Sequence, residues 1–305
     1  MILSVCPNPS VDKFLSLPSL HPTGVNRSTG ETAYPGGKGV HVALAVNELG
    51  SESHLAGIWG GPTGQWVKNE CEARGVRCYG PDVRGWTRTC LTLRTAKKHK
   101  DTEILERGPE INEEALSLFL NTLEQRIPVA KAVCISGSWP PGTPDDIYFE
   151  IKSICESADI PMWVDASGKR LKQAIEVHPY GIHMNKSEAR FLMGPAEHPS
   201  VYAKKLLNHC SISAVTDGAN GLFLANKDTM YHASHPVEHV ISSVGSGDCL
   251  LAGLLVSQIE GGDLEQMARN GTACGAANCI RPELGMLVEK DVKNFRDNVI
   301  CKIVA

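Results

Sequence analysis

The stretch Ser243 to Asp248, Ser-Val-Gly-Ser-Gly-Asp, joins a glycine-rich turn and a carboxylate directly before a run of apolar residues. Glycines let the backbone approach a ligand closely, and the first N–H groups of a helix have no partner within it, so such a turn can hold a phosphoryl group. A carboxylate there would repel a phosphate unless it served the other reactant, which makes Asp248 a candidate base for an attacking hydroxyl. On these residues alone, a helix cap in which Asp248 complements the helix dipole is an equal alternative.

A second glycine-rich turn, Pro35 to Gly39, reads Pro-Gly-Gly-Lys-Gly and precedes a helical pattern that ends near Gly50. Glycines around a lysine at a helix start suggest an anionic or hydroxylated ligand close to the backbone. The stretch fits neither the Walker A pattern nor the dinucleotide-binding fingerprint. A structural turn with a surface lysine is an equal alternative, and His41, taken alone, is typical of a packed histidine.

Other polar residues follow predicted strands. Asp12 comes soon after the strand expected at 2–5, where open α/β sheets gather ligand-binding groups, although a solvated loop acid is the more common case. Asn185 and Glu188 follow the strand expected at 181–184, and their i, i+3 spacing at a helix start would suit a hydrated magnesium ion. A capping box is the simpler explanation of the same pair.

The elements that must position these residues alternate between strands and helices, which predicts an α/β fold with a mainly parallel sheet covered on both faces. Residues 11–35 and 86–107 are β-rich instead, with a polar turn at 97–101 inside a hairpin. We interpret them as a small β lid or an edge hairpin within one domain, 1–305. Strands are expected at 2–5, 53–58, 76–79, 132–136, 162–165, 181–184, 213–216 and 221–225, and further helices at 65–74, 112–125, 248–260, 264–280 and from about 289.

The composition indicates an ordinary globular protein of 305 residues, with 42% hydrophobic and 21% charged residues. A formal net charge of −4 gives no general attraction to nucleic acid or an anionic membrane, so we expect neither as a partner and favour a small metabolite. The eleven cysteines include no C-x-x-C pair, which favours reduced thiols in the cytoplasm over disulfides or structural zinc. The start of the chain lacks a signal-peptide pattern, and no apolar run approaches the roughly 20 residues of a membrane-spanning helix.

Together the motifs resemble the PfkB family of carbohydrate kinases, which has the ribokinase-like fold, and within it the 1-phosphofructokinase and tagatose-6-phosphate kinase branch. The resemblance covers nearly the whole chain, and many motifs in the same order make it specific. They are Asn8 to Asp12, Pro35 to Gly39, Trp86 to Arg88, Thr102 to Ile104, Gly137 to Gly142, Asp165 to Gly168, Asn185 to Glu188, and Val244 to Asp248.

The resemblance implies ATP-dependent phosphorylation of a sugar hydroxyl, with a ketohexose phosphate as the expected acceptor and Mg²⁺ as the cofactor. It implies that Asp248 is the base, and that two copies of the chain associate through the lid. The amides of Gly245, Ser246 and Gly247 would form the anion hole. Asn185 and Glu188 would hold magnesium and the nucleotide phosphates through water, Thr216, Gly218 and Asn278 would lie near the nucleotide, and Asp12, Gly37, Lys38, His41, Arg88 and Ser138 would lie on the substrate side.

Departures from the family pattern cluster on the substrate side. His41 stands where the family usually has asparagine, and the lid strand lacks the usual asparagine and lysine, having Cys90 and Thr92 instead. Ser246, in place of the common alanine, is a mild change because the backbone forms the anion hole. An unphosphorylated sugar, a polyol or a nucleoside therefore stays open as the acceptor, while a non-enzymatic sugar-binding regulator is less consistent with the presence of Asp248.

Overall fold

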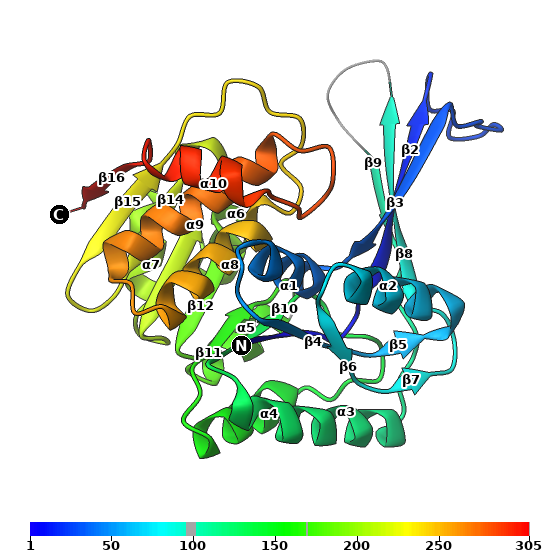
Figure 1. The fold of residues 1–305 in the computed structure, drawn as a ribbon, viewed down its shortest axis with the longest axis horizontal. Coiled ribbons are helices and arrows are strands. Elements are labelled where there is room, and N and C mark those ends of the chain that lie inside the picture. The colour runs from blue at the N-terminus through cyan, green and yellow to red at the C-terminus, as the bar shows by residue number, and fades with distance from the viewer. Residues whose placement is uncertain (96–101, 169, 305) are drawn as a thin grey trace.

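The computed structural model describes residues 1–95, 102–168 and 170–304 (Figure 1). The polar turn expected at 97–101 therefore lies outside the described residues. The predicted α/β architecture is confirmed, with a large central sheet, helices around it and a small separate sheet.

The central sheet has ten strands in the order β16-β15-β14-β13-β12-β11-β10-β1-β4-β6. From β13 to β6 all neighbours pair in parallel, as the alternation of strands and helices predicted. The parallel strands are β1 (Ile2–Cys6), β4 (Ser53–Gly57), β6 (Arg77–Tyr79), β10 (Ala132–Ser136), β11 (Met162–Asp165), β12 (Gly181–Asn185) and β13 (Ile212–Thr216). Strands β14 (Leu222–Ala225), β15 (Met230–Ser234) and β16 (Ile300–Ile303) extend the sheet antiparallel, and the last two were not predicted.

Helices cover both faces of this sheet, and each face has its own apolar cluster. The first face packs against α3 (Glu113–Arg126), α4 (Ile147–Ser157), α5 (Arg170–Glu176), α6 (Lys186–Met193) and α7 (Pro199–Leu206). The second packs against α1 (Lys38–Glu48), α8 (Ser246–Ile259), α9 (Leu264–Cys279) and α10 (Glu289–Arg296). Helix α8 is buried along its apolar run from Cys249 to Val256, because α1 and α9 flank it.

The second sheet projects from the main body and has the strand order β3-β2-β8-β9 (Figure 1). Its strands are β2 (Ser10–Leu17), β3 (Gly30–Gly36), β8 (Arg88–Thr95) and β9 (Thr102–Leu105), all from the two segments predicted to be β-rich. Strands β2 and β8 pair in parallel, which sets Ser10 beside Arg88 and Asp12 beside Cys90. A helix α2 (Gly61–Ala73) and a two-stranded sheet of β5 (Trp59–Gly60) and β7 (Asp82–Val83) lie next to it.

All eleven cysteines lie within the described ranges and are free thiols. In those same ranges, no helix combines the length and apolar character needed to cross a bilayer.

The start of α1 is pressed against β1 at Gly39. A Cβ atom at Gly39 would lie 2.6 Å from the Cβ of Cys6, which is closer than real side chains come, and 3.0 Å from the carbonyl oxygen of Val5. This close approach fixes the first turn of α1, which carries Lys38 and His41, relative to the central sheet.

We predict that Gly39→Ala lowers the free energy of unfolding by about 1–3 kcal/mol through overpacking, although alanine is the better helix former. The control is Glu48→Ala on the exposed side of the same helix, which should change stability by less than about 0.5 kcal/mol. Urea denaturation measures both. Equal stability of the two variants would contradict this account of the contact between α1 and β1.

Candidate functional site

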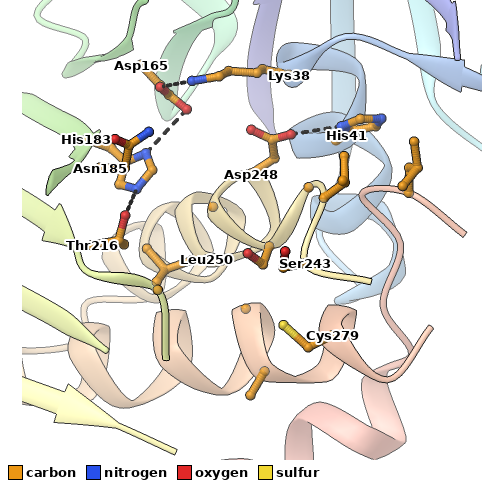
Figure 2. Close-up of a pocket in the computed structure, with 18 of the residues that line it drawn as sticks. Lys38, His41, Asp165, His183, Asn185, Thr216, Ser243, Asp248, Leu250 and Cys279 are labelled. Atoms are coloured by element: carbon orange, nitrogen blue, oxygen red, sulfur yellow. Dashed lines mark hydrogen bonds and ion pairs between the residues drawn. The ribbon is translucent and has the colours of Figure 1, made fainter. Parts of the chain in front are cut away.

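A cavity of about 920 Å³ lies at the carboxyl ends of the parallel strands, next to the starts of α1 and α8 and to the second sheet (Figure 2). Ligand sites in open α/β sheets occur at this edge. The cavity brings together almost all of the site residues predicted from the sequence. Those that line it are Asp12, Gly37, Lys38, His41, Arg88, Asn185, Glu188, Thr216, Gly218, Gly245, Ser246, Gly247 and Asp248.

Two predicted residues, Ser138 and Asn278, are not among the residues that line the cavity. The Ser138 hydroxyl accepts a hydrogen bond from the Asn8 amide at 3.2 Å. Asn278 is fully buried, and its amide donates to the carbonyl of Met286 at 2.9 Å. Both therefore support segments around the cavity in this structure.

The turn before α8 has the conformation that its glycines suggested. Gly245, the N-cap residue, is left-handed with φ 82°, and a Cβ atom there would lie 2.3 Å from the backbone nitrogen of Gly285. The Ser246 N–H donates to the Ser243 carbonyl at 3.2 Å. The next N–H groups, of Gly247 and Asp248, belong to the first helical turn, where backbone donors have no intrahelical acceptor. This end of α8 can therefore hold an anion.

Asp248 is in the first turn of α8, and its side chain points into the cavity toward His41 (Figure 2). Its Oδ2 atom is 2.8 Å from Nδ1 of His41, and Nε2 of the same ring is 3.5 Å from Oδ2 of Asp12. Burial would lower the pKa of His41, but these two carboxylates outweigh burial and raise its pKa to about 10. The ring therefore carries a positive charge at neutral pH.

Asp12 is a buried carboxylate rather than a solvated loop acid. The Ser10 hydroxyl donates to its Oδ1 atom at 2.6 Å. Burial would raise the pKa of Asp12, but His41, Ser10 and the charge of Arg88 outweigh burial and lower it. Asp12 is thus held as an anion at the base of the second sheet.

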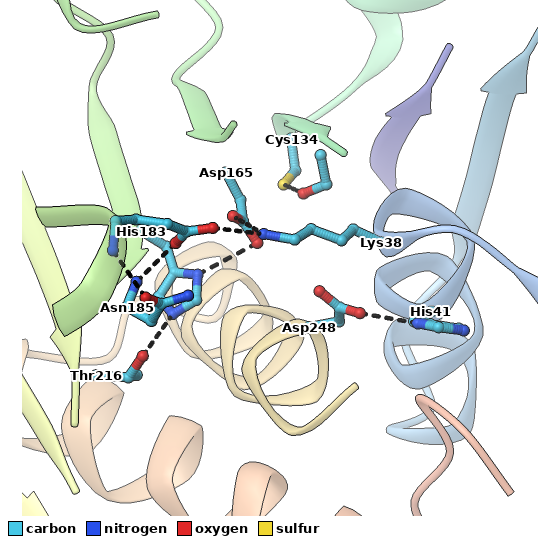
Figure 3. A network of polar contacts seen from close by, with 10 residues as sticks. Lys38, His41, Cys134, Asp165, His183, Asn185, Thr216 and Asp248 are labelled. Carbon is cyan, nitrogen blue, oxygen red and sulfur yellow. Dashed lines mark hydrogen bonds and ion pairs between the residues drawn. The ribbon is translucent and has the colours of Figure 1, made fainter. Parts of the chain in front are cut away.

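A separate polar network surrounds Lys38 (Figure 3). Its ammonium group is 2.7 Å from Oδ1 of Asp165 and 3.5 Å from Oε1 of Glu188. Burial would raise the pKa of Asp165, yet Lys38 and His183 hold it well below its ordinary value, and the same carboxylates raise the pKa of Lys38. Lys38, expected on the substrate side, therefore points toward the pair expected to bind metal and nucleotide.

Sequence reasoning assigned no role to two members of this network, Asp165 and His183. Nδ1 of His183 lies 3.3 Å from Oδ2 of Asp165, and its Nε2 lies 3.5 Å from the Thr216 hydroxyl. Asp165 is the one polar residue of β11, and His183 interrupts the apolar part of β12 before Asn185, and these interruptions are the signal that could have identified them.

Asn185 and Glu188 form a capping box at the start of α6, which was the simpler of the two interpretations. The box uses Oε2 of Glu188 and leaves Oε1 near Lys38. Across the described part of the chain, no group of three or more His, Cys, Asp or Glu side chains is arranged to hold a metal ion. One carboxylate and one amide still fit a hydrated Mg²⁺, which keeps most of its waters and takes its other ligands from substrate phosphates.

Comparisons with known proteins find relatives over nearly the whole chain. The sequence pattern of the pfkB family carbohydrate kinases matches residues 10–290. A 1-phosphofructokinase of Bacillus subtilis (strain 168) is 32% identical over 293 residues, which cover 93% of this chain and 94% of that protein. Phosphofructokinase-2 from Escherichia coli in complex with substrates and products has a TM-score of 0.91 at 23% identity, over 97% of this chain and 98% of that chain. Its tetrameric inhibited form has a TM-score of 0.87 at 23% identity, over the same 97% and 98%.

We predict that Lys38→Met lowers the free energy of unfolding by about 3 kcal/mol, because it leaves the Asp165 carboxylate buried without its cation. Lys38 holds the pKa of Asp165 below its ordinary value, so Asp165 is ionised at neutral pH and the stability lost in Lys38→Met should be greatest there. This loss of stability should shrink as the pH falls and Asp165 becomes protonated.

The matched control is Lys186→Met, which removes the 3.0 Å ion pair with Asp217 at a site where the lysine side chain is 43% exposed. Its cost should be below about 1 kcal/mol. Denaturant unfolding of both variants between neutral and acid pH makes the comparison. A Lys38→Met loss no larger than the control, or one that grows toward acid pH, would contradict the role given to the pair.

Proposed function

Because the chain belongs to the pfkB family of carbohydrate kinases, we propose that it transfers the γ-phosphoryl group of ATP to a hydroxyl of a ketohexose phosphate. Family membership and the related 1-phosphofructokinase make the chain a phosphotransferase with an alcohol group as acceptor. The observation that supports the finer proposal best is the Asp248 carboxylate, which faces the cavity from a helix start suited to an anion.

In this mechanism the acceptor oxygen attacks the γ-phosphorus, the bond from phosphorus to the β,γ-bridging oxygen breaks, and ADP leaves. Asp248 takes the proton of the attacking hydroxyl as the new bond forms. The amides of Gly245, Ser246 and Gly247 act as the anion hole for the phosphoryl oxygens. The Ser246 N–H already donates to the Ser243 carbonyl, so the other two amides contribute most.

The nucleotide would occupy the part of the cavity beyond α8, beside Thr216 and Gly218. Apolar side chains line this part and suit a flat base. Asn185 and Glu188 would hold a hydrated Mg²⁺, which when bound neutralises charge on the nucleotide phosphates. Lys38 lies 3.5 Å from Glu188 and is paired with Asp165, so it would balance the carboxylates beside the nucleotide. The apolar lining includes Pro236, Val237, Val240, Leu250 and Ala276.

The sugar would lie between Asp12 and Arg88 under the second sheet, which would act as the lid that excludes water. Arg88 donates through Nε to the Asn8 carbonyl at 3.2 Å, which orients its guanidinium group. We further propose that two copies of the chain associate through this sheet, where Ile104 and Leu105 are exposed. The mass of the protein in solution tests whether two copies associate.

A second candidate function is phosphorylation of an unphosphorylated sugar or polyol. Beyond Ser10, Asp12 and Arg88, the lid strands contribute Cys90, Thr92, Glu103 and Leu105 to the cavity, and none of these four carries a positive charge. Since Lys38 is paired with Asp165, Arg88 is the remaining lysine or arginine among the described lining residues. One arginine is a modest site for a substrate phosphate.

We predict that Asp248→Ala lowers kcat at least about 100-fold, as expected for loss of a general base, with ATP affinity nearly unchanged. Coupled ADP-release kinetics and calorimetric ATP titration measure the two quantities, and the exposed Asp228→Ala is the control for preparation and folding. Turnover close to that of the wild type in Asp248→Ala would refute the assignment of the base.

The acceptor can be identified by an ADP-release screen with ATP and Mg²⁺ over free and phosphorylated ketohexoses, polyols and nucleosides. If a sugar phosphate is the best acceptor, Arg88→Ala should raise its KM at least about tenfold, because a charge-assisted contact is lost. The exposed Arg84→Ala is the control and should leave KM unchanged. A better unphosphorylated acceptor, together with little effect of Arg88→Ala, would select the second candidate and leave the kinase assignment intact.

A further inference from the structure

His41 lies between two buried carboxylates that come from different elements. Asp248 of α8 faces Nδ1 at 2.8 Å, and Asp12 of β2 faces Nε2 at 3.5 Å. The three side chains are 8%, 12% and 4% exposed for Asp248, Asp12 and His41. Nε2 makes no hydrogen bond to any described residue, and the Asp12 carboxylate at 3.5 Å is the charged group that it faces.

This arrangement requires a particular charge state of the ring. A neutral imidazole has one N–H and one lone pair, so a neutral ring would direct its lone pair at one of the two carboxylates. An imidazolium has an N–H at both positions and is attracted to both. Its raised pKa agrees with this geometric argument.

The two cations near the ring are themselves attracted to its carboxylates. From β8, Arg88 acts on Asp12 and helps to keep it ionised, and Lys38, one turn earlier on α1, acts on Asp248. From β1, the thiol of Cys6 is neutral because burial raises its pKa to about 11. The two carboxylates therefore dominate the electrostatics of the ring.

The backbone at Gly285 leaves room for the imidazole ring of His41. A Cβ atom at Gly285 would lie 2.1 Å from Cγ of His41, so only a glycine fits against the ring at this point. The contact on one side and the carboxylates at both nitrogens hold the ring in one orientation.

We propose that His41 is a positioning residue that, as an imidazolium, links Asp12 to Asp248 and keeps the Asp248 carboxylate directed into the cavity. The inference rests on the proposed role of Asp248 as the base. The asparagine usual in the family could donate to one carboxylate but would carry no charge. Turnover of this chain should therefore depend on protonation of the His41 ring, and an asparagine at position 41 has no such protonation.

The first test is the pH dependence of kcat for the wild type, His41→Asn and His41→Ala. At pH 7.5 we expect kcat to fall about tenfold in His41→Asn and about 100-fold in His41→Ala, with the KM for ATP unchanged, because the amide restores a neutral hydrogen bond. The wild type should lose activity as the pH rises toward the His41 pKa of about 10, and His41→Asn should lack this loss. The control His54→Asn, at a buried histidine paired with Glu52 outside the cavity, should keep the wild-type profile.

The second test measures the ring directly and needs no activity. Nitrogen-15 NMR of the histidine side chains, assigned by the signal lost in His41→Asn, should show the doubly protonated ring from pH 7 to about 10. In Asp12→Asn the ring should lose its proton at lower pH, because one carboxylate is gone.

A neutral His41 ring at pH 7, or an alkaline loss of activity that persists in His41→Asn, would overturn the inference while sugar phosphorylation by the wild type still supported the proposed function. The proposed function fails differently, through absence of turnover with every acceptor in the wild type. That result would overturn the positioning role as well, whatever charge the ring carries.

Discussion

The first turn of α1 supplies the charge balance on which the rest of the site depends. Lys38 and His41 are three residues apart, so they leave the same helix turn, yet their charges go to different carboxylates. Lys38 pairs with Asp165 at the end of β11, and His41 pairs with Asp248 on α8 and with Asp12 on β2. Burying these carboxylates without a cation would cost several kcal/mol each, so the position of α1 controls whether the cavity can exist in its ionised form. The close contact of Gly39 with β1 fixes that position.

This pairing also explains why an acidic cavity can serve phosphate chemistry. The lining contains the anions Asp12, Glu103, Asp165, Glu188 and Asp248, and the cations Lys38, His41 and Arg88 offset three of these five charges. A phosphoryl group therefore meets a smaller negative excess than the carboxylates alone would create, and the fixed dipoles at the start of α8 decide where its oxygens are stabilised. Such preorganised groups suit the transfer of a phosphoryl group between two bound reactants, because the negative charge moves from one reactant to the other and the total charge in the cavity stays the same.

The sequence predicted the fold well because strand and helix periodicity are local properties. The parallel strands and the β-rich segments lie where the sequence indicated, and nearly all of the predicted site residues line the cavity. The sequence could not predict the pairings, since Lys38 and Asp165 are 127 residues apart and His41 and Asp248 are 207 apart. His183 was missed because one histidine in an apolar strand has no local signature of its partners. Strands β15 and β16 were missed because their half-exposed residues have no clear alternation, and only pairing with β14 orders them.

The departures from the family pattern are linked through one residue, Asp12. The register of β2 and β8 sets Cys90 beside Asp12, and His41 faces the same carboxylate from α1. Relative to the pattern that the resemblance implied, the chain lacks a cation at Thr92 on the projecting sheet and has one at His41 in the body of the protein. The two changes do not compensate each other, because His41 is already paired with two carboxylates and has no charge to spare for a substrate phosphate. If Asp248 is the base, as proposed, the charge at position 41 would act on the base and the missing charge at position 92 on substrate choice, so that the two ends of the reaction could vary independently in this chain.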